Sequence, residues 1–401
     1  GNRSILLVPE QFTSSTDARS SRELGDARSG MVESYSFTSL AEHILAVEGG
    51  AAVQTLTDAG RAVLVRRALE ELQDNVHYYY RHRRSAAYCQ MAAETIDELK
   101  SAGLSGQQLQ ELARDCGTES AKLGELALIF QGYESLLAGT GMDPADRLEL
   151  AADRLEAALA RDELPDFLRE REVFIDEFDT FNAPKKRLMG AMLAALPAVT
   201  VALCEDGAPM QPGDLELFSG AKQVAAQLRQ LARKNGAQVA APELLRRDLR
   251  HKDAPGLAAL TELLETGSCT PPESAPELRL FAAASREVEA RCAAAAIRRL
   301  MRQGVRCGKI AVVCRDISLY RAAVRYELRM AEIPLYCDEP TTPEFSAPAT
   351  AVRALLALLR GADMTEQLTV LAKTGQCALT EPEVCALENS ASPGSPKAAA
   401  W

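Results

Sequence analysis

The feature that most constrains the fold is a short aliphatic segment that recurs along the chain and is followed each time by polar residues. "SILLVPEQ" (4–11), "EVFIDEF" (172–178) and "AVTVALCED" (198–206) have this form, and the helical pattern "APKKRLMGAMLAAL" separates the last two. Such runs are typical of buried parallel strands, whose polar loops follow their carboxyl ends. The pattern predicts an α/β fold with ligand-binding groups at one sheet edge.

The order of these patterns predicts two α/β lobes, the first of them interrupted. "MVESYSFTSLAEHIL" adds a strand near 31–35 and a helix, and apolar residues at helical spacing fill about 55 to 160. After the linker-like "SCTPPESAPE", "LRLFAAA" and "KIAVVCRD" read as strands of a second sheet. We expect five regions: 1–52, the beginning of the first lobe; 53–165, a helical insertion; 166–270, the remainder of the first lobe; 271–345, the second lobe; 346–401, the start of a second helical insertion.

Composition excludes several classes of protein. The apolar runs fall short of the roughly 20 residues of a membrane span, and the first residues lack signal-peptide features, so we expect a cytoplasmic location without membrane contact. A net charge of −11 argues against coating nucleic acid indiscriminately and leaves room only for a local basic track. The ten cysteines form no C-x-x-C pair. No metal site is predicted, since no H-E-x-x-H motif joins the four histidines His43, His77, His82 and His251.

An ordered set of segments resembles one known family. "LLVPEQFT", "VESYSFTSLAEHIL", "MDPADRL", "VFIDEFDTF", "ELFSGAKQVAAQLRQLARKNG", "REVEARCAAAAI" with "KIAVVCRD", "IPLYCDEP" and "LAKTGQCALTEPEVCALEN" occur in the order seen in the B subunit of AddAB-type helicase–nucleases. The resemblance covers almost the whole chain. It implies two RecA-like parallel-sheet lobes of superfamily 1 helicase type, with helical insertions.

The resemblance also implies a function and partners. Enzymes of this family process double-strand DNA breaks for recombination, so the expected partners are DNA and an AddA-type helicase–nuclease subunit. The family implies ATP, Mg²⁺ and an iron–sulfur cluster as cofactors. We expect none of them to be held by these residues, since the nuclease carboxylates and cluster cysteines of relatives lie beyond Trp401.

The phosphate-binding motif G-x-x-x-x-G-K-[ST] does not occur in the chain. "GVRCGKI" (304–310) is one residue too short between its glycines and ends in Ile310. In relatives the loop stands just before the strand that here begins at Ser4. We therefore expect a scaffold that binds DNA and a partner without turnover, and the alternative is an active motor whose phosphate loop lies upstream.

Asp176 and Glu177 are the candidate catalytic residues. At the end of a strand, Asp would bind Mg²⁺ and Glu would orient water, either as a working or as a vestigial motif. Many relatives have Gly in place of Glu177. The structural alternative is that these acids cap the following helix, with Asp179 the strongest cap candidate.

Candidate DNA contacts come from four segments. Gln11 ends "PEQ"; Ser36, Phe37 and Thr38 lie in "SYSFTSL", where hydroxyls could bond phosphate and an aromatic could stack, or could instead cap a helix and fill the core. "HYYYRHRR" (77–84) combines aromatic and basic residues, and the alternative is a solvated face. The candidate residues are Gln11, Ser36, Phe37, Thr38, Arg81, Arg83, Arg84 and Arg315, the last of which could instead pair with Asp316.

One hypothesis of another class is a serine hydrolase of the penicillin-recognising type. "SGAK" (219–222) and "KTG" (373–375) match its S-x-x-K and K-T-G elements in order. The context argues against it, because K-T-G belongs on a strand and here follows a helical pattern, and S-D-N is missing.

Overall fold

The computed structural model describes residues 3–207, 217–245, 249–337 and 346–391. It divides into two compact units, residues 1–278 and 279–401. Each unit is described by itself, beginning with the first. The finer division into five regions stays a prediction.

The first unit is built on a parallel sheet of four strands in the order β2-β1-β3-β4. The strands are β1 (Ser4–Leu7), β2 (Val32–Tyr35), β3 (Glu172–Ile175) and β4 (Ala198–Val201). Leu7 pairs with Tyr35 on one side and Ile175 on the other, and Ile175 pairs with Val201. The prediction of an α/β fold with a parallel sheet that resumes at "EVFID" is confirmed.

One face of this sheet carries the main core. Side chains alternate along a strand, so Ile5 and Leu7 of β1 and Val173 and Ile175 of β3 all point to the same face and are buried. They pack in one cluster with apolar residues of α3 (Phe37–Glu48), α8 (Pro144–Ala160) and α9 (Ala183–Ala195). Burying each large aliphatic side chain contributes roughly 1.5–3 kcal/mol, and the cluster thereby fixes the strand ends.

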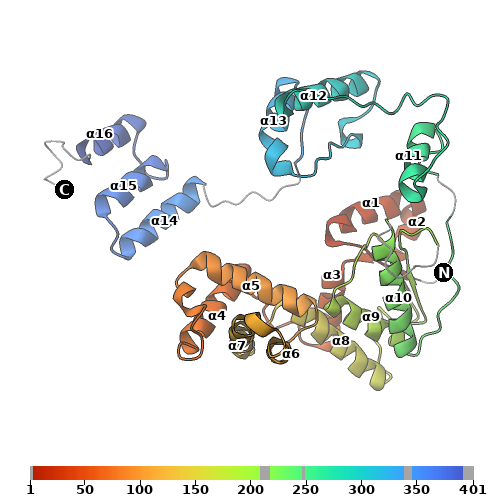
Figure 1. Ribbon diagram of the computed structural model, residues 1–401, viewed down its shortest axis with the longest axis horizontal. Helices are drawn as coiled ribbons and strands as arrows, with labels where there is room; N and C mark the ends of the chain where they lie inside the picture. Colours follow the sequence, from red (N-terminus) through yellow and green to blue (C-terminus); the bar gives the residue numbers. More distant parts are fainter. Residues whose placement is uncertain (1–2, 208–216, 246–248, 338–345, 392–401) are drawn as a thin grey trace. The chain divides into compact units, whose positions relative to one another are not determined.

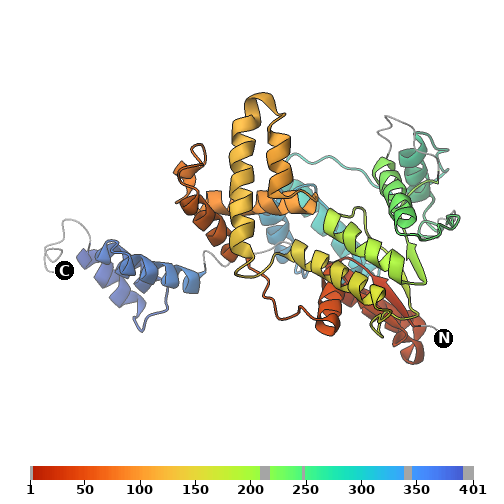
Figure 2. The same cartoon turned by 90° about the horizontal axis from the view of Figure 1, so that it is seen from below.

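Four helices of the first unit share a second core; we call α4 (Asp58–Glu71), α5 (Ala86–Ser101), α6 (Gly106–Ala113) and α7 (Ser120–Leu137) the helical group (Figure 1). Thr57, Ser85 and Ser105 cap three of them, each accepting a backbone N–H with its hydroxyl. Ile129 and Phe130 lie in their shared core. Figure 2 shows the same group turned by 90°.

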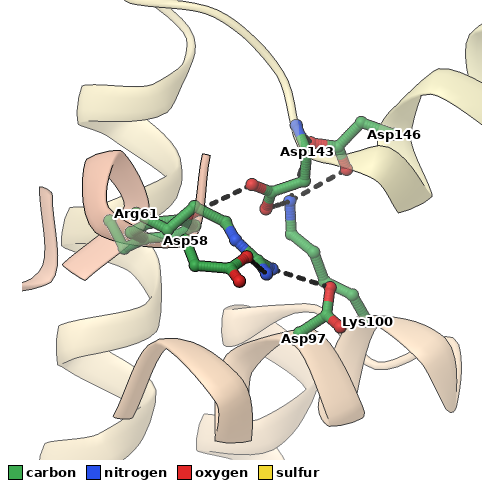
Figure 3. A network of polar contacts seen from close by, with 7 residues as sticks. Asp58, Arg61, Asp97, Lys100, Asp143 and Asp146 are labelled. Carbon is green, nitrogen blue, oxygen red and sulfur yellow. Dashed lines mark hydrogen bonds and ion pairs between the residues drawn. The ribbon is translucent and has the colours of Figure 1, made fainter. Parts of the chain in front are cut away.

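A buried ion network joins the helical group to α8 (Figure 3). The Lys100 ammonium lies 3.0 Å from Asp143 Oδ2 and 2.8 Å from Asp146 Oδ1. The Tyr133 hydroxyl donates to Asp143 Oδ1 at 2.7 Å, and Asp143 is only 1% exposed. Nearby, Arg61 bonds Asp58 and Asp97. "MDPADRL" is therefore a structural motif that starts α8 and neutralises a buried lysine.

The described residues of the first unit form further helices and 3-10 turns, and Val224 of one of these helices packs into the main core. These elements are η1 (Glu10–Phe12), α1 (Thr13–Leu24), α2 (Asp26–Ser29), η2 (Tyr80–His82), η3 (Gly117–Glu119), α10 (Ser219–Lys234) and α11 (Pro255–Thr266). Nowhere in the described ranges is a helix both long and apolar enough to span a bilayer.

The second unit contains helices. The two helices α12 (Arg286–Arg302) and α13 (Ile317–Met330) pack together through residues that include Ala294, Ile297 and Leu328. The other described elements of this unit are η4 (Cys307–Lys309), α14 (Ala347–Leu359), α15 (Met364–Lys373) and α16 (Glu381–Ala391). The predicted strands "LRLFAAA" and "KIAVVCRD" are wrong for the described residues of this unit, where neither segment is a strand. A strand needs a neighbour for its backbone N–H groups, and these segments find none there; Val313 is 91% exposed. A second RecA-like lobe is thus not confirmed.

Candidate functional site

The four parallel strands end in register, so the residues that follow them lie at one edge, here called the carboxyl edge. Gln11 follows β1 in η1, Thr38 follows β2 in the first turn of α3, and Asp176 and Glu177 follow β3. All four side chains are exposed. Ligands of open α/β sheets bind in this position, outside the carboxyl ends of the strands.

Asp176 and Glu177 have the geometry of a polar turn rather than of a helix cap. The Asp176 backbone N–H donates to Leu7 O at 3.0 Å, and Asp176 Oδ1 accepts the Glu177 N–H at 2.8 Å. Glu177 has φ +64°, a left-handed conformation that costs energy for a non-glycine residue. The N-cap of α9 is Asn182, whose Oδ1 accepts the Lys185 N–H at 3.0 Å. The capping alternative for Asp176, Glu177 and Asp179 is therefore wrong.

The segment after β2, residues 36–39, contains residues that stabilise the fold and one residue that is exposed. Ser36 and Ser39 form a capping box, in which each side chain accepts the other's backbone N–H. Phe37 is 2% exposed and packs edge-on against Phe178, with the ring centroids 5.3 Å apart. Thr38 points outward. Thr38 is thus the exposed member of these three candidate residues, and DNA contact by Ser36, Phe37 and Thr38 stays a prediction.

Lys185 at the carboxyl edge was missed by sequence reasoning. Its ammonium lies 5.3 Å from the Phe178 ring centroid and 5.8 Å from that of Phe37. Burial lowers the pKa of Lys185, and the nearby Glu10 opposes that shift. The signal was the sequence Lys185, Lys186, Arg187 near the N-terminus of a helix, where the helix dipole disfavours cations.

The "HYYYRHRR" segment lies in the helical group. Tyr79 packs against the core of this group, whereas Tyr78 is 46% exposed and Arg81 and Arg84 are exposed. The Arg83 guanidinium covers the Tyr80 ring at 3.9 Å. Part of the segment is therefore core, and Tyr78, Arg81 and Arg84 are exposed. DNA contact by Arg81, Arg83 and Arg84 stays a prediction.

Glu125 of α7 anchors this segment. Its two carboxylate oxygens accept the backbone N–H groups of His77, Tyr78 and Tyr79 at 2.8 to 3.2 Å. Three successive N–H groups converging on one carboxylate fix the backbone that presents Tyr78 and Arg81.

Arg315 lies in the second unit, on the exposed segment before α13. Its expected alternative partner, Asp316, instead caps α13 by accepting the Ser318 N–H at 2.9 Å and hydroxyl at 2.6 Å. These bonds hold the pKa of the Asp316 carboxyl below its usual value. Phosphate contact by Arg315 stays a prediction.

The serine-hydrolase elements have the wrong context. Lys222 of "SGAK" is buried and lies 3.0 Å from Asp206 Oδ1. Lys373 of "KTG" ends α15 and pairs with Glu388, although that motif requires a strand. Within the described ranges, no three His, Cys, Asp or Glu side chains lie close enough together to hold a metal ion.

An open parallel sheet with helices packed against it defines an α/β domain. Comparison with known proteins specifies the family. Residues 1–261 match the family model described as "ADDB, N-terminal". The chain is 32% identical over 346 residues to the B subunit of an ATP-dependent helicase/deoxyribonuclease from Desulforudis audaxviator, covering 83% of this chain and 29% of that protein.

Two further relatives carry the same name. The protein of Symbiobacterium thermophilum is 31% identical over 88% of this chain and 31% of its own length. That of Heliobacterium modesticaldum is 28% identical over 96% of this chain and 32% of its own length. The chain belongs to the AddB N-terminal family, and it spans less than a third of the length of these relatives.

Proposed function

We propose that the chain is a DNA-binding and partner-binding scaffold in a cytoplasmic helicase–nuclease complex that processes double-strand breaks for recombination repair. The observation that carries the proposal is the carboxyl edge, where three successive strands deliver the exposed side chains Gln11, Thr38 and Asp176 to one side of the sheet. An amide and a hydroxyl are suitable donors to phosphate and sugar oxygens. The relatives are named as one subunit of an enzyme, which supports a partner subunit, and we propose one of AddA type.

The scaffold turns over no nucleotide by itself in this proposal. Phosphoryl transfer depends on groups that hold and neutralise the phosphates, and the 401 residues contain no G-x-x-x-x-G-K-[ST] loop. The nearest string ends in η4, a single 3-10 turn, and does not lead into a helix that could bind phosphate at its N-terminus. ATP, Mg²⁺ and the iron–sulfur cluster are proposed for the whole enzyme, and the second unit is proposed to contribute to a second helicase-like lobe.

DNA binding is tested with fluorescence anisotropy of a labelled oligonucleotide. The double substitution Gln11→Glu and Thr38→Glu places two negative charges at the carboxyl edge and should weaken binding about tenfold or more by like-charge repulsion. Because both side chains are exposed, the melting temperature should not change. Gln230→Glu with Gln303→Glu is the matched control, since it adds the same charge at exposed positions of α10 and of the turn after α12. Equal binding by both double variants contradicts the proposal.

A nucleotide-driven motor is the second candidate function. It is favoured by the exposed acids Asp176 and Glu177 at the end of a central strand and by the strained backbone of Glu177. The test is Glu177→Gln in the complete two-subunit enzyme. A motor loses most of its ATPase and unwinding rate, and unchanged rates assign the motor work to another site.

A further inference from the structure

The ammonium of Lys185 lies close to segments that follow three strands of the first unit. Phe37 is the first residue of α3, which follows β2, and Phe178 lies in the β3–α9 connection that precedes Lys185. Glu10, shortly after β1, is close enough to act on the charge of Lys185. The Lys185 ammonium therefore lies at the carboxyl edge, although Lys185 does not directly follow a strand in the sequence.

Lys185 differs from its neighbours in its partners. Arg187 pairs with Asp153 at 2.9 Å and with Glu156, and Lys186 donates to Gln227 Oε1 at 2.6 Å. Within the described ranges, Lys185 makes no ion pair or side-chain hydrogen bond, and it contacts the faces of Phe37 and Phe178 instead. Partial burial removes some of the water that would solvate the Lys185 ammonium. The cation–π interactions with the two aromatic faces replace only part of that lost solvation.

An anion at this edge would give the Lys185 ammonium the hydrogen-bonded, negatively charged partner that the described residues do not provide. We propose that Lys185 binds a phosphate group at the carboxyl edge. The proposal rests on the proposed function, and it names the charged group of that site. The Lys185 ammonium is a charged donor, and its hydrogen bonds to phosphate oxygens are roughly twice as strong as those of a neutral donor.

Two sources can supply this phosphate, the backbone of a single DNA strand or a nucleotide. Lys185→Met separates the charge from the packing, because Met keeps an unbranched apolar stem against Phe37 and Phe178. Lys186→Met is the matched control one residue along the same helix. Both variants are measured in the whole 401-residue chain, with oligothymidylate by anisotropy and with ATP by calorimetry.

The expected result is about a tenfold loss of affinity for one of the two ligands in Lys185→Met and no change in Lys186→Met. For oligothymidylate the slope of log affinity against log salt should also fall by about 0.7, the value for one phosphate contact on a single strand. Lys185→Arg keeps the charge and should keep this slope. A loss confined to oligothymidylate assigns the phosphate to DNA, and a loss confined to ATP assigns it to a nucleotide.

The melting temperature shows that the variants are folded, and it should not fall in Lys185→Met because a poorly solvated charge is removed. If the wild-type chain binds a ligand and Lys185→Met binds both ligands with unchanged affinity, this inference is wrong, and the proposed function still stands. An equal loss in both methionine variants also overturns it, since the effect would then be one of net charge. A wild-type chain that binds neither ligand overturns the proposed function together with the inference.

Discussion

Two groups of acidic residues in the first unit come from similar acid-rich sequences, but one group is buried and the other is exposed to solvent. Asp143 of "MDPADRL" is buried, and it accepts from Tyr133 and pairs with Lys100 (Figure 3). Asp176 of "VFIDEFDTF" is exposed, and among the residues that the structure describes its side chain accepts only the neighbouring Glu177 N–H. The difference teaches that a satisfied, buried carboxylate holds the fold, whereas an exposed carboxylate at the end of a strand is available for a ligand.

The largest effect is expected at the buried member of this comparison. Asp143→Ala leaves the Lys100 ammonium and the Tyr133 hydroxyl without their shared partner, and it should cost about 3–5 kcal/mol of unfolding free energy. Urea unfolding measures the loss. Asp166→Ala is the control, because the Asp166 side chain is 97% exposed. A loss below about 1 kcal/mol at Asp143 would show that the network is not a structural element.

The same network predicts a pH dependence. Burial and the bond to Asp143 raise the pKa of Tyr133, and the carboxylates of Asp146 and Asp143 raise that of Lys100 although burial opposes it. Both groups hold their proton more tightly in the folded chain, so the stability they contribute is complete at lower pH. It is lost as pH rises above their unfolded values of about 10, at about 1.4 kcal/mol per pH unit for each proton. Tyr133→Phe should reduce the slope of unfolding free energy between about pH 10 and 11, and an unchanged slope would contradict the assignment.

The exposed cations of the helical group should affect DNA affinity and leave stability unchanged. Reversing both Arg81 and Arg84 to Glu should weaken oligonucleotide binding about tenfold and lower its salt dependence, because each arginine can meet one phosphate. Arg154→Glu, an exposed reversal on α8, is the control. Equal affinity in all three proteins would favour an interaction module without DNA contact at this segment. Adding the reversal of Arg83 should add less, since Arg83 is stacked on Tyr80.

The smallest effect is expected at the exposed acids. Glu177→Gly relieves a backbone with φ +64° and should raise the unfolding free energy by up to about 1 kcal/mol. Asp179→Gly is the control, because Asp179 has no positive φ and glycine there only adds freedom to the unfolded chain. A loss of stability in Glu177→Gly would show that the Glu177 side chain stabilises the turn.

Local sequence patterns predicted the first sheet well because its strands meet one another. "SILLVPEQ", "EVFID" and "AVTVALCED" all became parallel strands, and their alternation buries Ile5 and Ile175 on one face. "KIAVVCRD" has the same pattern and is not a strand, since pairing depends on a neighbour that no local pattern encodes. The acids were placed correctly at the strand end, but their capping alternative failed because Asn182, not Asp179, starts α9.

The sequence prediction looked for site residues directly after each strand, and it therefore missed Lys185, which lies in the following helix. The folding of the chain brings the Lys185 ammonium to the carboxyl edge. Two aromatic residues far apart in the sequence, Phe37 and Phe178, surround its ammonium. Likewise, Glu125 reaches the backbone of Tyr78 only through the packing of α7. Such contacts are long-range, and only the fold reveals them.

The central claim is that the carboxyl edge of the sheet meets a nucleic-acid strand. Photo-crosslinking of the chain to an oligonucleotide containing bromodeoxyuridine, with mass-spectrometric mapping of the attached peptides, tests it most directly. The account predicts crosslinks in peptides that contain 9–11, 36–38 or 176–185. Crosslinks confined to other peptides, such as those of α14 to α16, would contradict it.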